Sequence, residues 1–201
     1  DDQGRVRIRF ATDARAGVEQ GGFYQALASG NYARRGLNVE IVQGGPTVDV
    51  PRLMSSGAVE LGLCSSSFVP LRLAADSAPV KAVAAFFQKD TAALLTHPDP
   101  APDSIADLTG RPMLLSQAWV DTVWHWLKAE YSFSDDQLGP YRFEPAAFLA
   151  DTASVQQGQI TVDPYVIRDA GGFEPRSFLL ADAGYASYGA IVLSPDAFAR
   201  D

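Results

Sequence analysis

Polar side chains that could hold a small solute follow the first predicted strand, Val6–Phe10. Asp13 and Gln20 lie in the loop after it, and Tyr24 lies in the first turn of the next predicted helix. A carboxylate accepts hydrogen bonds, and a Gln amide offers both donors and an acceptor to a polar heterocycle. Gln20 could equally be an ordinary residue near a helix start. The loop is therefore a candidate binding segment.

Small and polar residues also follow the next predicted strands. Ser65 and Ser66 come after the strand Leu61–Cys64 and precede a helix. Hydroxyls and backbone N–H groups in this position bind anionic or carbonyl groups, or they cap the helix. The segment Gly44–Gly45–Pro46 is read as a tight turn. Cys64 is expected to be a small buried hydrophobe rather than a reactive thiol.

The second half contains three tryptophans. Trp124, Leu127 and Tyr131 fall at helical spacing on one stripe, which is typical of a core. Trp119 and Ser116 lie before that helix, in a predicted loop after a strand. Flat ligands stack well on such rings. Trp119 is therefore the candidate stacking residue, with Ser116 beside it.

Later candidates lie at a helix start and at two predicted chain crossings. Asp163 precedes Pro164, so its carboxylate either binds an amino group of a ligand or caps the helix. Gln88 lies at the first crossing and is a ligand candidate. Tyr185 and Tyr188 flank the second crossing, where one could contact the ligand and the other could pack on the hinge.

Composition excludes several functions. The net charge is −8 and the basic residues form no dense run, so nucleic acids and anionic membranes are unsuitable partners. The single cysteine permits no internal disulfide. No apolar run approaches the ~20 residues that span a bilayer. No metal-ligand cluster or phosphate-loop motif is present, and we expect neither a metal nor a cofactor.

Strand and helix patterns alternate along the chain, which predicts an α/β fold with parallel-rich sheets flanked by helices. In such sheets, ligands bind at the carboxyl ends of the strands. The further predicted strands are Val39–Val42, Val80–Phe86, Pro112–Leu115, Tyr141–Phe143, Ser177–Leu180 and Tyr188–Leu193. The predicted helices are Phe23–Arg35, Val48–Ser56, Ser67–Ala75, Thr122–Tyr131, Ala147–Ala150, Ala153–Gln157 and Pro164–Asp169.

Ordered segments over nearly the whole chain resemble the nitrate, sulfonate and thiamine-pyrimidine group of periplasmic substrate-binding proteins of ABC importers. They include GGFYQALASGNYARRGLNVEIVQGG, SSGAVELGL, PVKAVAAFFQKD, HPDPAPDSIADLTGRP, FLADTASVQQG, VDPYVI and FLLADAGYASYGAIVLS. The resemblance implies a type II bilobed fold with two hinge crossings. Lobe 1 would comprise residues 1–87 and 192–201, and lobe 2 residues 91–187, with crossings near 88–90 and 188–191.

The resemblance also implies a function. The chain would be a monomeric periplasmic protein that binds a small-molecule ligand in the interlobe cleft and delivers it to an ABC transporter permease, without inserting into a membrane. The opening DDQGRV is similar to a mature N-terminus after signal-peptide cleavage. A thiamine pyrimidine precursor is the first ligand class, followed by riboflavin-like and aromatic sulfonated ligands. Relatives carry Trp and His where Ala14 and Gln20 stand, which points to a changed or a lost ligand. They carry Glu where Asp163 stands.

Other functional classes are weaker. Pyrimidine-synthase relatives use a cysteine-rich segment and an active-site His, whereas this chain has one Cys and a Gln at the His position. We therefore expect no catalytic residues and no enzymatic activity. A sensor that kept the binding lobes is a further alternative. Relatives continue beyond the position of Asp201, so the C-terminal part of the family fold is expected to be absent and lobe 1 incomplete.

Overall fold

The computed structural model of the protein describes residues 4–45 and 48–200. The predicted mature start at residues 1–3, Pro46 of the predicted turn and the terminal residue 201 lie outside this range. The chain divides into two compact units. The first holds the described residues up to Asp90 and from Ser187 onward, and the second holds Thr91–Ala186. The segment 188–191, expected as a crossing, lies in the first unit.

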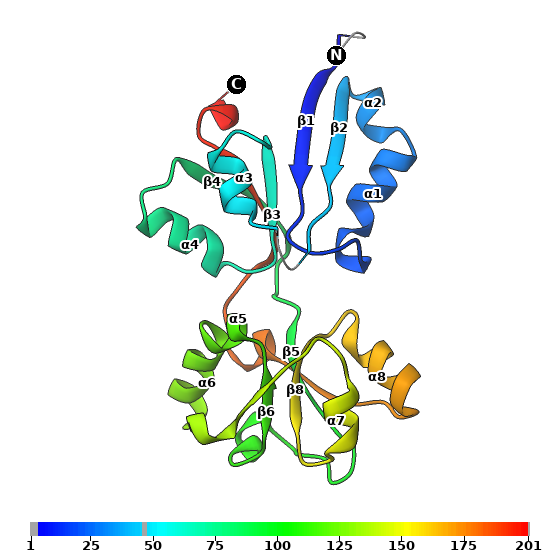
Figure 1. The fold of residues 1–201 in the computed structure, drawn as a ribbon, viewed down its shortest axis with the longest axis vertical. Helices are drawn as coiled ribbons and strands as arrows, with labels where there is room; N and C mark the ends of the chain where they lie inside the picture. Colours follow the sequence, from blue (N-terminus) through cyan, green and yellow to red (C-terminus); the bar gives the residue numbers. More distant parts are fainter. Residues whose placement is uncertain (1–3, 46–47, 201) are drawn as a thin grey trace. The chain divides into compact units, whose positions relative to one another are not determined.

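The first unit contains a five-stranded sheet in the order β2-β1-β3-β10-β4 (Figure 1). All strands run in one direction except β10, which is antiparallel to both neighbours. Its elements are β1 (Val6–Ala11), the 3-10 helix η1 (Val18–Gln20), α1 (Gly21–Ala28), α2 (Asn31–Arg34), β2 (Leu37–Val42), α3 (Val50–Ser55), β3 (Leu61–Cys64), α4 (Phe68–Ala75), β4 (Val80–Phe87), β10 (Gly189–Pro195) and the 3-10 helix η5 (Phe198–Arg200).

The second unit contains a five-stranded sheet in the order β7-β6-β8-β5-β9, in which β5 alone is antiparallel to its neighbours. Its elements are β5 (Ala92–Thr96), the 3-10 helix η2 (Ile105–Leu108), β6 (Met113–Leu115), α5 (Gln117–Val120), α6 (Val123–Tyr131), the 3-10 helix η3 (Asp135–Gln137), β7 (Leu138–Pro140), α7 (Ala146–Ala150), β8 (Val155–Gln159), α8 (Asp163–Gly171), β9 (Arg176–Leu179) and the 3-10 helix η4 (Leu180–Ala183). The predicted α/β class with two sheets is confirmed.

Local chemistry sets several element boundaries. Asp49 accepts a hydrogen bond from the backbone N–H of Arg52 and so caps α3. α8 has Pro164 in its first turn, and its C-cap is Gly172, whose φ is 74°. Gly30, with a φ of 70°, interrupts the predicted helix Phe23–Arg35, which forms α1 and α2 instead.

Three predicted elements of the second unit were wrong. The segment Ala92–Thr96, read as a connection, is the central strand β5, buried along its whole length. Ala153–Gln157, read as a short helix, overlaps β8 because alternate residues face two packed layers. The strand expected at Tyr141–Phe143 is β7 at Leu138–Pro140, which ends before the two aromatic residues.

Each unit has its own core on both faces of its sheet. In the second unit, Leu94 lies in the cluster around Trp124 and Leu127, and its neighbour Leu95 lies in a second cluster with Phe148 and Ile167. The first unit has a cluster around Leu193 and Met54 and another around Phe10 and Leu63. Trp124 is 1% exposed, which confirms its predicted place in the core.

Candidate functional site

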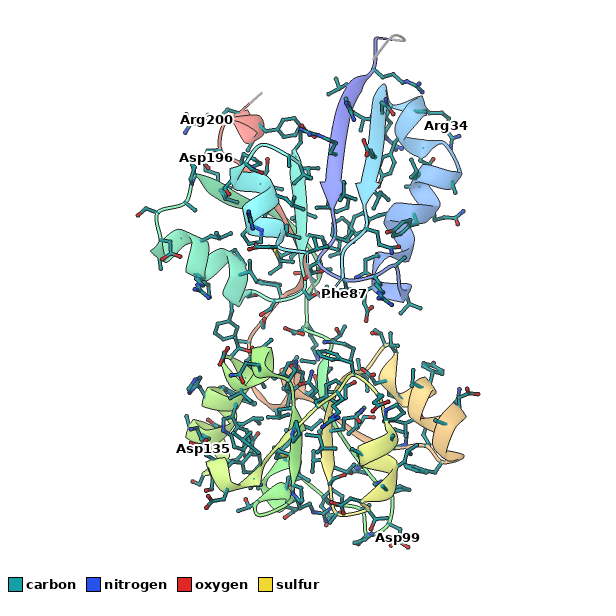
Figure 2. The ribbon with its side chains drawn as sticks, in the orientation of Figure 1. Arg34, Phe87, Asp99, Asp135, Asp196 and Arg200 are labelled. Atoms are coloured by element: carbon teal, nitrogen blue, oxygen red, sulfur yellow. The ribbon has the colours of Figure 1, made fainter. Side chains whose placement is uncertain are left out.

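The carboxyl ends of β1, β2, β3 and β4 lie at one edge of the first sheet, and antiparallel β10 begins there. We call this the first carboxyl edge. Figure 2 labels Phe87 at this edge, whereas Arg34, Asp196 and Arg200 lie toward the opposite edge of the same unit. Asp196 pairs with Lys81 at 3.8 Å and with Arg200 at 3.7 Å. These ion pairs therefore lie away from the candidate site.

Asp13 is the most constrained polar residue at the first carboxyl edge. Its Oδ2 accepts a hydrogen bond of 2.5 Å from the backbone N–H of Ser65, so the loops after β1 and β3 are joined. Its Oδ1 is buried and has no hydrogen-bond partner among the described residues. Burial raises the pKa of the Asp13 carboxyl, and hydrogen bonding from Ser65 offsets part of this rise. A buried acceptor with an unused oxygen is suited to a ligand that brings a donor.

Thr12, which the sequence patterns did not single out, fixes the loop that carries Asp13. Its hydroxyl accepts from the backbone N–H of Gly44 at 2.9 Å and donates to the carbonyl of Ala14 at 2.9 Å. A Cβ at Gly44 would collide with the carbonyl oxygen of Thr12. The glycine after β2 is therefore required because two backbones approach closely. In the sequence, the signal that could have identified this contact was a Thr directly after one predicted strand together with a Gly after the next.

Gln20 and Tyr24 have different environments. Gln20 is 4% exposed, and its Oε1 accepts from the backbone N–H of Gly17 at 3.1 Å. This bond closes the turn before η1, which favours the structural alternative for Gln20. The hydroxyl of Tyr24, in the first turn of α1, is buried and has no hydrogen-bond partner among the described residues. Tyr24 thus adds a second unused polar group.

The serines after β3 are tied to the start of β10. The Ser67 hydroxyl accepts from the backbone N–H of Tyr188 at 2.9 Å and also lies 3.2 Å from its carbonyl oxygen. Ser66 Oγ accepts from the backbone N–H of Phe68 at 3.3 Å, and Ser65 is exposed. Burial and then the Asp13 charge raise the pKa of the Cys64 thiol to about 12. The thiol is therefore protonated near neutral pH and is no nucleophile.

Gln88 and Tyr188 lie at the same edge, because Phe87 and Gly189 are paired neighbours across β4 and β10. Gln88 is exposed and its Nε2 donates to the carbonyl of Ala85 at 3.1 Å. Tyr188 is 52% exposed. Both side chains are accessible at the first carboxyl edge.

In the second unit, Trp119 and Tyr185 belong to the core. Trp119 is 9% exposed and lies in α5, so the predicted loop is wrong at this position. Tyr185 is 5% exposed, and its ring centroid lies 5.2 Å from that of Trp126. Burial in one hydrophobic cluster leaves little ring surface for stacking on a solute. A Trp119→Ala variant would therefore report on stability more than on a ligand.

Ser116 and Asp163 lie at the edge of the second sheet where β6, β7 and β8 end, which we call the second carboxyl edge. The backbone N–H of Ser116 donates to Oε1 of Gln157, and Ser116 Oγ accepts from the backbone N–H of Trp119 at 3.4 Å. Asp163 Oδ2 accepts from the backbone N–H of Gln159 at 2.5 Å. Asp163 therefore joins the end of β8 to the first turn of α8. The helix begins at Asp163, one residue earlier than predicted, so the N-cap is Val162 and the predicted capping role of Asp163 is wrong.

The described residues contain no group of three or more His, Cys, Asp and Glu side chains placed to hold a metal ion. None of the helices in residues 4–45 and 48–200 combines the length and apolarity that a membrane crossing requires. Among the predicted site residues, Asp13 and Ser65 are hydrogen-bonded to each other on the first unit, and Ser116 and Asp163 lie at the second carboxyl edge.

Solved structures show the same fold. The aliphatic sulphonate binding protein SsuA from Escherichia coli matches with a TM-score of 0.71 at 15% identity, over 96% of this chain and 63% of that chain. SsuA from Xanthomonas axonopodis pv. citri bound to MOPS matches with a TM-score of 0.64 at 18% identity, over 97% and 67%. An ABC uptake substrate-binding protein from Streptococcus pneumoniae with bound histidine gives 0.62 at 15%, over 96% and 81%.

The chain therefore spans about 63% of the length of the Escherichia coli protein. These proteins are described with different ligands, so the shared fold alone does not select one. A search of curated protein sequences found no significant match. The model of the NMT1/THI5 like family matches residues 18–201, which cover the second unit and the first unit from η1 onward. The chain belongs to the NMT1/THI5-like family.

Proposed function

We propose that this chain is the solute-binding component of a periplasmic ABC importer, acting as a monomer with a transporter permease as its partner. The observation that carries the proposal is the unused Oδ1 of Asp13, a buried carboxylate oxygen at the carboxyl end of a parallel strand. The family and the fold of ABC substrate-binding proteins support the same role.

The ligand class follows from the charge of the site. A carboxylate favours a ligand with an amino or ring N–H donor, because a charge-assisted hydrogen bond is stronger than a neutral one. It disfavours a sulfonate or nitrate, since like charges repel strongly in a poorly hydrated site. In the second unit, Asp163 is a separate candidate carboxylate that favours the same kind of donor. The thiamine pyrimidine precursor class meets these requirements better than an alkanesulfonate.

The buried hydroxyl of Tyr24 supports a ligand that also carries polar ring atoms. A phenol donates or accepts, so an unpaired buried Tyr hydroxyl can bind a ring nitrogen or a hydroxyl of a heterocycle. The role involves no bond making, and the protonated Cys64 thiol supplies no nucleophile. The chain is proposed as a binding protein and not as an enzyme.

Calorimetry with a panel of hydroxymethyl aminopyrimidine, riboflavin, taurine and nitrate tests this function. Asp13→Asn should weaken aminopyrimidine binding by about 10-fold, the size expected for loss of one charge-assisted hydrogen bond. The matched control is Asp49→Asn, because Asp49 also accepts a backbone N–H but lies exposed at the start of α3. Mass spectrometry of natively purified protein can identify a retained ligand directly.

Binding of taurine or nitrate without any aminopyrimidine or flavin binding would overturn the ligand class. It would leave the role in solute binding standing. An equal loss of affinity in Asp13→Asn and Asp49→Asn would remove Asp13 from the site.

A further inference from the structure

Two aromatic residues that the sequence patterns assigned to a strand lie just beyond β7 in the second unit. Tyr141 follows Pro140, the last residue of β7, and its backbone N–H donates to the carbonyl of Leu115 at 3.2 Å. This bond continues the β6–β7 pairing and places Tyr141 at the second carboxyl edge. Phe143 follows two residues later, and its ring centroid lies 5.0 Å from that of Tyr141.

Phe143 has a conformation that the fold alone does not explain. Its side chain is the most exposed of the large hydrophobic residues described, at 76%. Its φ is 59°, in the left-handed region that bulky L-residues adopt only at a cost. A glycine or asparagine would make this turn without that cost. Residues held in strained backbone conformations cluster at active sites and ligand-binding sites.

Asp163 lies close enough to influence Tyr141. Burial, followed by the negative charge of Asp163, raises the pKa of Tyr141 to about 12. The Tyr141 phenol therefore stays protonated near neutral pH. Asp163 itself is half-buried and is the first residue of α8, which follows β8. In the sheet, β6 lies between β7 and β8. The second carboxyl edge thus brings an aromatic pair and a carboxylate into one neighbourhood.

We infer that Phe143, supported by Tyr141 and accompanied by Asp163, is the ring-binding part of the second unit and selects flat heterocycles that carry an N–H donor. The inference rests on the proposed function and assigns to Phe143 the stacking role that Trp119, packed in the core, does not fill. The exposed face of Phe143 stacks on the heterocycle, and Asp163 accepts from its amino group. The Tyr141 ring packs against the Phe143 ring, with their centroids 5.0 Å apart.

Calorimetry with hydroxymethyl aminopyrimidine and riboflavin tests this inference. Phe143→Ala should weaken binding of both probes by about 10-fold, whereas Phe143→Tyr should stay within about 3-fold of the unaltered chain. Phe143→Asn is the second loss-of-ring variant, because Asn tolerates the left-handed backbone and the fold is retained. The control is Phe86→Ala, which removes an exposed Phe ring with one aromatic neighbour in the first unit.

The outcomes separate the two proposals. Weakened binding in Phe143→Ala and Phe143→Asn, with Phe86→Ala unchanged, supports the stacking role. Unchanged affinity in the two Phe143 variants overturns it and leaves the proposed function standing. Failure of the unaltered chain to bind any probe, taurine and nitrate included, overturns both. In the same assay, Asp163→Asn should weaken binding more than Asp163→Glu, and equal effects would remove the carboxylate from the ring site.

Discussion

Helices α1 and α4 of the first unit bury no residue, whereas α6 and α8 of the second unit bury Trp124, Leu127 and Ile167. The edge strands β2 and β4 likewise contain no buried residue. Yet the two sheets have the same pattern, with four strands in one direction and the fourth strand in the order antiparallel. A shared strand pattern therefore does not imply equal stability, since stability follows the apolar area that the outer layers bury.

The two carboxyl edges therefore lie on sheets that are packed to different degrees. The first edge carries unused polar atoms on a thinly covered sheet, and the second carries the strained and exposed Phe143 on a well-packed one. Regions with few buried contacts open at a lower free energy than packed cores. We expect solute binding to order the first unit more than the second.

The largest expected effect comes from removing one aromatic ring that packs against the sheet in each unit. Phe148→Ala should lower the free energy of unfolding by about 3–5 kcal/mol, because Phe148 is fully buried beside His97. Phe23→Ala should cost only about 1–2 kcal/mol, because the Phe23 ring is half-buried and packs on Phe10 and Phe86. Denaturant unfolding, with hydrogen exchange measured at each sheet, gives the loss of unfolding free energy for each variant. Equal losses would contradict the expected difference in packing between the two units.

Glycines at the two carboxyl edges give a second contrast. Gly44→Ala should cost about 3 kcal/mol, because the new Cβ meets the Thr12 carbonyl and the backbone carbon of Asp13. It should also weaken solute binding by moving Asp13. Gly158→Ala should cost about 1–2 kcal/mol, because the nearest atom is Leu95 Cδ1, at the end of a side chain rather than in the backbone. Thermal unfolding of both variants checks the order, and a larger loss in Gly158→Ala would reverse it.

Relief of backbone strain should raise stability in the second unit. Phe143→Gly is expected to gain about 1 kcal/mol, because glycine adopts a φ of 59° freely and the lost ring is exposed. Ala190→Gly in the first unit, with a φ of 49°, should gain less because Ala190 is buried in β10. A stability loss in Phe143→Gly, measured by denaturant unfolding, would show that the ring supports the fold.

The smallest expected effect depends on pH. The pKa of Asp13 is raised in the folded protein, so its ionisation disfavours the folded state as pH rises through that raised value. Below the unfolded-state pKa the carboxyl is neutral in both states and this cost is absent. Asp13→Asn should therefore stabilise the protein by less than about 1 kcal/mol near neutral pH and by nothing in acid. An equal gain at both pH values would show that charge is not the cause.

The sequence predicted those elements whose periodicity and end signals agree. β3 matches its predicted bounds, and Trp124 lies in the core as its helical spacing indicated. β5 was missed because the run before Pro98 is buried on both faces and has no alternation to reveal a strand. β8 was read as a helix because its Gln residues carry no strand preference, although Gln156 is 2% exposed.

The candidate site was less predictable than the fold. Loop positions placed Asp13 and Ser65 at strand ends, and the two residues are hydrogen-bonded to each other. Local spacing could not show that the Trp119 ring turns into the core, because this depends on packing against distant residues. Nor could it show that β7 ends before Tyr141, which leaves Phe143 exposed.

The position of β10 in the first sheet has a consequence for the order of synthesis. This strand lies between β3 and β4 and completes the hydrogen bonding of both, yet it follows β4 by about 100 residues of chain. At a translation rate of ~5–20 residues per second, β3 and β4 wait about 5–20 s for their common neighbour. The second unit is continuous in sequence and can fold during that interval. As the chain emerges, the first unit is therefore expected to be the last to close its sheet, with the apolar edge of β4 available to chaperones until then.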